Sequence, residues 1–209
     1  MQKENQDYAV TSDNEQQRKK VLLMATVPIG LLLNHAMGIL TLYLKLPLYL
    51  DNIGMFLVTI LVGVPAGVIT GILSSLLGGL LINPVIPYYT ASPIALALVA
   101  GWMAKKGYFR SIPRAIVTGI LLGLVGATCN APLVILFSGF TGTCTDATTA
   151  LLLANGQSLF TSAFFANFVN DPFDKIIQCL LVVWMIRGFP KKLQIRFANS
   201  GYLMRNLIK

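Results

Sequence analysis

The chain has 209 residues, of which 55% are hydrophobic and 11% are charged, and its formal net charge is +8. Soluble domains carry roughly 25% charged residues, so this composition argues against a water-soluble fold and predicts an all-α integral membrane protein with room for about six helices. Because most of the chain is apolar, it lacks the exposed basic surface that binding to nucleic acid needs. We interpret the positive charge as a signal of membrane topology.

The first 20 residues are polar and are expected to form a cytoplasmic tail. The apolar stretch that follows, 21–44, is too long for the core of a cleavable signal peptide and predicts a retained first span. It contains Asn34 and His35, each of which must be paired or face a cavity at that depth. His35 is the single histidine, so a histidine-based metal cluster is excluded. The two residues either hydrogen-bond between helices or contact a ligand.

Fourteen of the sixteen lysines and arginines fall in three clusters: before residue 21, at 105–114, and from 187 onward. Basic clusters beside membrane spans stay in the cytoplasm, so the number of crossings between successive clusters must be even. The middle apolar stretch, 53–82, is interrupted by Gly-Val-Pro-Ala-Gly at 63–67, where proline and glycine favour a turn. We therefore predict a hairpin of two spans there, followed by a span at 91–104.

The second half of the chain contains apolar stretches at 115–138, 149–169 and 173–186. The run Ala-Asn-Gly-Gln-Ser at 154–158 is too polar for a lipid-facing helix centre. We therefore expect 149–169 to be an extra segment that re-enters the protein or lies on its outer face before the last helix. The prediction is a six-transmembrane-helix bundle within 21–190, a basic tail at 191–209, and both termini in the cytoplasm.

Small residues recur every four positions along two of these helices. Residues four apart share a helix face, so each series forms a groove in which helices can approach closely. Either the grooves pack helices within one bundle, or one of them docks another membrane subunit. The candidate docking series is Gly63, Gly67, Gly71, Ser75 and Gly79, and the second series is Gly119, Gly123, Ala127 and Ala131.

Polar and aromatic residues gather in the segments predicted to lie outside. Aromatic rings beside amides and hydroxyls are typical of a pocket for a small polar organic molecule. The alternative is an interfacial belt of tyrosine with turn-forming asparagine and proline. The candidate substrate-binding residues are Asn34, His35, Tyr49, Asp51, Asn52, Asn83, Tyr88, Tyr89, Asn130, Thr141, Thr143, Thr145, Asp146, Asn170 and Asp174.

Catalytic motifs are absent from the sequence. There is no Gly-x-x-x-x-Gly-Lys-[Ser/Thr] loop to hold phosphate, and neither Gly-x-Ser-x-Gly nor His-Glu-x-x-His occurs. The three cysteines are widely spaced and predict neither a disulfide framework nor a metal site. We expect a chain that is not an enzyme and carries no cofactor.

Several strings together resemble one transporter family. They are Leu-Pro-Leu-Tyr-Leu-Asp-Asn-Ile-Gly at 46–54, the Gly-Pro-Ala hairpin, Gly-Gly at 78–79 leading to Asn-Pro at 83–84, Ala-Lys-Lys-Gly-Tyr-Phe-Arg at 104–110, Thr-Gly-Thr-Cys-Thr-Asp at 141–146 and Asn-Asp-Pro-Phe-Asp-Lys at 170–175. This arrangement resembles the substrate-binding S components of energy-coupling factor (ECF) transporters. The resemblance covers about residues 21–192.

The resemblance implies a six-helix bundle in a bacterial cytoplasmic membrane that captures a vitamin or related micronutrient at its outer face. It also implies assembly with a membrane coupling subunit and two cytoplasmic ATPases, and release of the substrate inside by toppling of the bundle. Several family members dock through a small-xxx-small pair on the first helix, whereas here Ala25 is followed by Ile29. We therefore predict that the glycine series that begins at Gly63 docks the coupling subunit in place of that pair.

The substrate is not specified by the sequence. Few fixed positive charges on the predicted outer face argue against a strongly anionic ligand, so we expect a water-soluble vitamin, a vitamin precursor or a nucleoside. Two other functions stay open. One is a secondary carrier that works alone, and the other is a membrane sensor or structural subunit that transports nothing.

Overall fold

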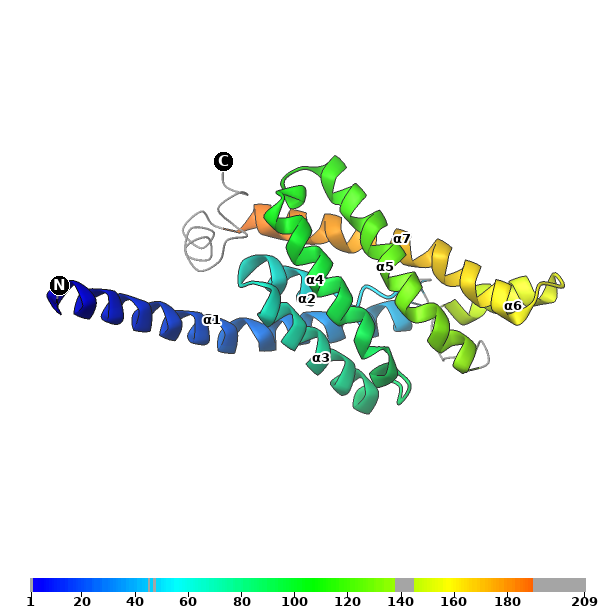
Figure 1. Ribbon diagram of the computed structural model, residues 1–209. Helices are drawn as coiled ribbons and strands as arrows, with labels where there is room; N and C mark the ends of the chain where they lie inside the picture. Colours follow the sequence, from blue (N-terminus) through cyan, green and yellow to red (C-terminus); the bar gives the residue numbers. More distant parts are fainter. Residues whose placement is uncertain (1, 45, 47, 138–144, 190–209) are drawn as a thin grey trace.

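The computed structural model describes residues 2–189 apart from 45, 47 and 138–144. Over these residues the chain forms seven α-helices and two short 3-10 helices, and no strand (Figure 1). This confirms the all-α prediction. Three of the described helices contain segments long and apolar enough to cross a membrane, at 20–43, 64–81 and 112–134. Their presence indicates a membrane protein.

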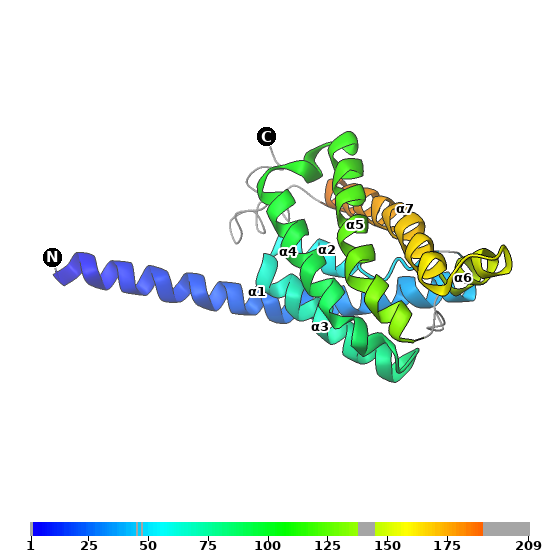
Figure 2. The same ribbon diagram turned by 45° about the vertical axis from the view of Figure 1, so that its right-hand side comes forward.

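Helix α1, Gln2–Tyr43, is 42 residues long. Its first half projects well beyond the other helices in both views (Figures 1 and 2). Residues 2–20 were expected to be only a polar tail, but they continue the helix of the first span. Glu, Gln, Lys and Arg are frequent there and all favour helix, which accounts for the difference.

Helices α2, Ile53–Leu61, and α3, Val64–Leu81, meet at Gly63, where the backbone φ is +132°. This is the break that the sequence predicts, because only glycine adopts that conformation without strain. The helices then run antiparallel: a Cβ at Gly67 would overlap the side chain of Thr59, and one at Gly71 would lie 3.0 Å from Met55 Sδ. The predicted hairpin is therefore present.

Helix α2 has nine residues, which corresponds to about 14 Å, or half of the ~30 Å hydrocarbon core. All nine are buried. The loop before α2 runs back along α1. The Thr41 hydroxyl donates to Tyr49 O, a Cβ at Gly38 would lie 3.8 Å from Asp51 Cβ, and Asn34 Oδ1 accepts from Gly54 N–H. The sequence analysis did not predict this return along α1.

After the 3-10 turn η1, Ile86–Thr90, helix α4 covers Ala91–Lys105. The turn η2, Tyr108–Arg110, leads into α5, Ile112–Leu136.

Helix α6, Thr145–Ala154, is followed by a turn with a left-handed Gly156 and then by α7, Leu159–Gly188. The segment 149–169 was predicted to be separate from the last helix. The predicted boundary at its C-terminal end was wrong, because residues 159–169 belong to α7, which continues through Pro172 as one helix of 30 residues. The polar run does end a helix, and α6 folds back on the beginning of α7 (Figures 1 and 2).

Helices α5 and α7 lie close together because glycines on α5 face the backbone of α7. A Cβ at Gly119 would overlap Ile176, and one at Gly123 would overlap the backbone at Pro172. The second small-residue series therefore packs helices within this chain. Apolar side chains of α1 and α3 face outward instead, and Leu32 and Leu80 are 75% and 84% exposed. Such surfaces suit contact with lipid acyl chains.

Replacing Gly54 with alanine is expected to destabilise the bundle. The new Cβ would overlap the carbonyl oxygen of Gly30 on α1, and the two backbones must separate to admit it. Overpacking of this kind costs about 1–3 kcal/mol. The measurement is the thermal unfolding midpoint of the detergent-purified protein, with Gly188→Ala as the control because no atom lies within 4 Å of a Cβ there. Equal midpoints for both variants would contradict the close α1–α2 contact.

Candidate functional site

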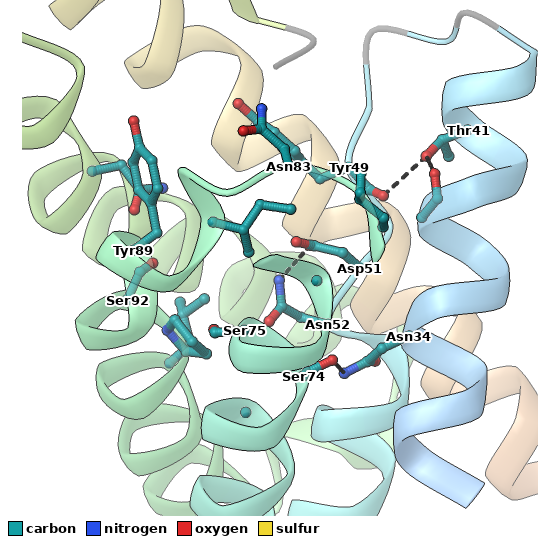
Figure 3. Close-up of a pocket in the computed structure, with 18 of the residues that line it drawn as sticks. Asn34, Thr41, Tyr49, Asp51, Asn52, Ser74, Ser75, Asn83, Tyr89 and Ser92 are labelled. Carbon is teal, nitrogen blue, oxygen red and sulfur yellow. Dashed lines mark hydrogen bonds between the residues drawn. The ribbon is translucent and has the colours of Figure 1, made fainter. Parts of the chain in front are cut away.

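A cavity of about 170 Å³ lies among α1, the loop before α2, α3, η1, α4, α5 and α7. Figure 3 shows amide, hydroxyl and carboxyl groups from different elements directed toward this space. It is bordered by the C-terminal parts of α1 and α3 and the N-terminal part of α4. The basic residues Lys105 and Lys106 lie at the other end of α4. The cavity therefore lies away from the 105–114 basic cluster.

Eight of the fifteen predicted substrate-binding residues line this cavity. They come from four separate segments of the chain, so the fold brings polar residues predicted within the membrane spans together with polar residues predicted outside. The eight are Asn34, His35, Tyr49, Asp51, Asn52, Asn83, Tyr89 and Asn130.

The other predicted residues lie elsewhere. Tyr88 is 63% exposed and its ring packs edge-on against Phe137, with centroids 5.4 Å apart. Asn170 donates to the Thr148 hydroxyl, and Asp146 is on α6, outside the cavity lining. These three residues therefore lie outside the cavity, and their part in substrate binding stays a prediction. Asp174 does not line the cavity but supports it, as described below. Thr141 and Thr143 fall outside the described residues, as does the side chain of Thr145.

The sequence analysis did not place several lining residues in the site. The most important is Lys175, which lies outside the three basic clusters, together with Asp171 four residues before it. A lone lysine next to two aspartates in an apolar helix is a signal that could have identified it, because a buried charge needs a partner. The other missed polar lining residues are Thr41, Ser74, Ser75, Ser92 and Asn167.

Asn34 connects three helices. Its Oδ1 accepts from the backbone N–H groups of Gly54 and Met55 at 2.7 and 3.2 Å, and its Nδ2 donates to Ser74 Oγ at 3.1 Å (Figure 3). The first N–H groups of a helix have no partner within it. Asn34 on α1 therefore supplies the N-terminal cap of α2, and its amide is committed to the fold although it borders the cavity.

Asp174 fixes the loop that carries Tyr49. Its Oδ1 accepts from the backbone N–H groups of Tyr49 and Leu50 at 3.0 and 2.9 Å. Its Oδ2 accepts from Lys175 Nζ and Gln178 Nε2, both at 2.7 Å. Leu50 has a φ of +49°, which is uncommon for a residue other than glycine. The two hydrogen bonds from the loop N–H groups to Asp174 Oδ1 hold Leu50 in this conformation. One buried carboxylate thus attaches the loop to α7.

Charged groups of both signs meet at the α7 side of the cavity. Lys175 Nζ binds Asp174 and interacts electrostatically with Asp51 and Asp171. It also lies 5.9 Å from the centroid of the Tyr49 ring. Asp171 Oδ2 accepts from Asn130 Nδ2 at 3.3 Å. The cavity wall therefore combines carboxylates, one ammonium group and an aromatic face.

Asp51 is exposed to the cavity and accepts a short hydrogen bond from the Asn52 amide (Figure 3).

The glycines proposed for partner docking pack against other residues of the same chain. Gly67 faces α2, Gly71 lies against Met55 and Pro93, and Gly79 faces Pro87. Ser75 lines the cavity. A docking face must be accessible to a second protein, so the placement of a partner on Gly63, Gly67, Gly71, Ser75 and Gly79 is corrected in favour of packing within the bundle.

Comparisons of the chain with protein-family models, with curated proteins and with solved structures each found no match.

The Asp174 and Lys175 pair can be tested by a double-mutant cycle. Removing one partner of a buried ion pair costs about 3–5 kcal/mol, because the other charge stays buried without compensation. We therefore expect Asp174→Asn and Lys175→Met each to lower the thermal unfolding midpoint strongly, and the double variant to lose at least 1 kcal/mol less than their sum. Asp146→Asn, outside the cavity, serves as the control. Additive losses would show that the two residues act independently.

Proposed function

We propose that this chain is the substrate-binding S component of an ECF-type importer, which binds a small water-soluble molecule in the cavity and hands it to a coupling subunit and two ATPases. The observation that carries the proposal is the cavity itself, whose largely apolar walls carry amide, hydroxyl and charged groups from several helices. Pockets lined by apolar walls and a few convergent polar groups are typical of small-molecule sites. The likeness of the sequence strings to S components supports the same reading.

The positions of the charges support a cavity on the outer side. Arg187 donates to the Arg110 carbonyl at 2.9 Å, so two basic clusters meet at one end of the bundle. The cavity lies nearer the opposite ends of α4, α5 and α7. Basic clusters beside spans stay in the cytoplasm, and on this rule the cavity faces outward. Both termini are then cytoplasmic.

The same arrangement accommodates six crossings. They are α1, the returning loop together with α2, then α3, α4, α5 and α7. The second crossing needs only nine helical residues because the loop before it covers part of the depth. Since every residue of α2 is buried, its short length exposes no unpaired backbone to lipid.

Ligand-induced thermal stabilisation of the detergent-purified chain tests the binding function. The panel contains water-soluble vitamins, their precursors, nucleosides and nucleobases. Binding at 100 times Kd should stabilise the protein by about 2.7 kcal/mol. Asp51→Ala is expected to weaken binding of the stabilising compound, whereas Asp146→Ala is expected to leave it unchanged, because only Asp51 lines the cavity. If no compound stabilises folded protein, the sensor or structural function replaces the present proposal.

Uptake into proteoliposomes tests the need for partners. The chain alone is expected to accumulate no substrate under an ion gradient, and co-reconstitution with an ECF coupling subunit and its two ATPases is expected to give ATP-dependent uptake. Gradient-driven uptake by the chain alone would identify a secondary carrier instead.

A further inference from the structure

The cavity has more negative than positive charge around it. Its charged lining residues are Asp51, Asp171 and Lys175, and Asp174 lies directly behind Lys175. Lys175 Nζ lies 2.7 Å from Asp174 Oδ2, in an ion pair that is almost wholly buried. Lys175 therefore compensates the charge of Asp174. Besides Lys175, the basic side chain among the described lining residues is that of His35, whose Nδ1 lies 2.9 Å from the carbonyl oxygen of Leu31 on its own helix.

Two buried acceptors at this wall have no donor. Asp171 is 1% exposed, and although its Oδ2 accepts from Asn130, its Oδ1 has no hydrogen-bond partner. The Oδ1 of Asn130 also has none. Both residues line the cavity. A buried acceptor without a donor costs about 1–3 kcal/mol, and more when it is charged. A ligand that carries N–H donors would remove this cost.

An aromatic face completes the site. The ring of Tyr49 already lies near a cation, at 5.9 Å from Lys175 Nζ, and Tyr89 borders the cavity from η1. Cations are attracted to the faces of aromatic rings within about 6 Å. Hydroxyl and amide groups of Ser75, Ser92 and Asn52 border the remaining space. Charge, free acceptors and aromatic rings thus favour the same kind of ligand.

We propose that the cavity selects a small organic cation, whose protonated nitrogen donates to Asp171 and is held between Asp171 and Asp51. This inference rests on the proposed function, because it names the substrate class of the same cavity. The sequence analysis disfavoured only a strongly anionic ligand, and the present inference narrows the substrate class to cations. A carboxylate or phosphate would meet the two aspartates and find Lys175 already engaged by Asp174.

Matched probes separate charge from shape. Benzamidine and benzylamine are cations at pH 7, benzamide and benzyl alcohol are their neutral counterparts, and benzoate is the anion. We expect each cation to bind the purified full chain at least tenfold more tightly than its neutral counterpart in calorimetric titration, with no binding of benzoate. Equal binding of the neutral counterpart, preference for benzoate, or no binding of either cation would each overturn the inference.

Three amide variants locate the site. Asp171→Asn and Asp51→Asn are each expected to raise the Kd of benzamidine at least tenfold, while Asp146→Asn, a carboxylate outside the cavity, leaves it unchanged. Thermal unfolding without ligand establishes which variants are folded, and Asp51→Asn carries the test if Asp171→Asn is not. Unchanged Kd in a folded Asp51 or Asp171 variant would refute the assignment.

The inference and the proposed function can fail separately. If benzamidine binds through both aspartates but the chain does not assemble with a coupling subunit, the cation site stands and the transporter assignment falls. If the assembled complex imports a neutral or anionic compound whose Kd is insensitive to both aspartates, the transporter assignment stands and the cation site falls.

Discussion

The cavity depends on the carboxylate of Asp174, which joins a loop to the helix that forms the opposite wall. Its four hydrogen bonds go to two backbone N–H groups of the loop, to Lys175 and to Gln178. Without them the loop would leave α7, and Leu50 would lose the bonds that hold its left-handed conformation. The position of Asp51 in the cavity follows from this attachment. Lys175 and Gln178, which lie on the same helix as Asp174, hold its carboxylate in place by donating hydrogen bonds to Oδ2.

Close helix contacts make room for this polar interior. Glycine permits two close backbone contacts, between Gly30 and Gly54 and between Gly123 and Pro172. Small residues permit such approach in a membrane, where burial of apolar surface drives helix association less than it does in water. Gly126 lies beside Asp171, and a Cβ there would be 3.3 Å from its Oδ2. The same residue type that packs the bundle thus also leaves space for a carboxylate.

Sequence patterns predicted local features better than they predicted which segments lie inside the bundle. The helix break at Gly63 was predicted because it depends on residues next to one another, and the α5 series was recognised by its spacing. The return of the loop with Asp51 along α1 was not predicted, because no local signal shows it. Lys175 was missed although Asp171 and Asp174 lie within four residues of it on α7, and its proximity to Asp51 exists only in three dimensions. Pattern alone also could not tell that α7 continues through Pro172, opposite a glycine on α5.

The cap that Asn34 provides for α2 has a consequence for the order of folding. A helix of nine residues is too short to be stable by itself, and here the acceptor for its first N–H groups belongs to another helix. Asn34 is in turn oriented by Ser74 of α3. Helices α1 and α3 must therefore enter the membrane and meet before α2 can form between them. Helix α2 is therefore completed after α3, although it precedes α3 in the chain.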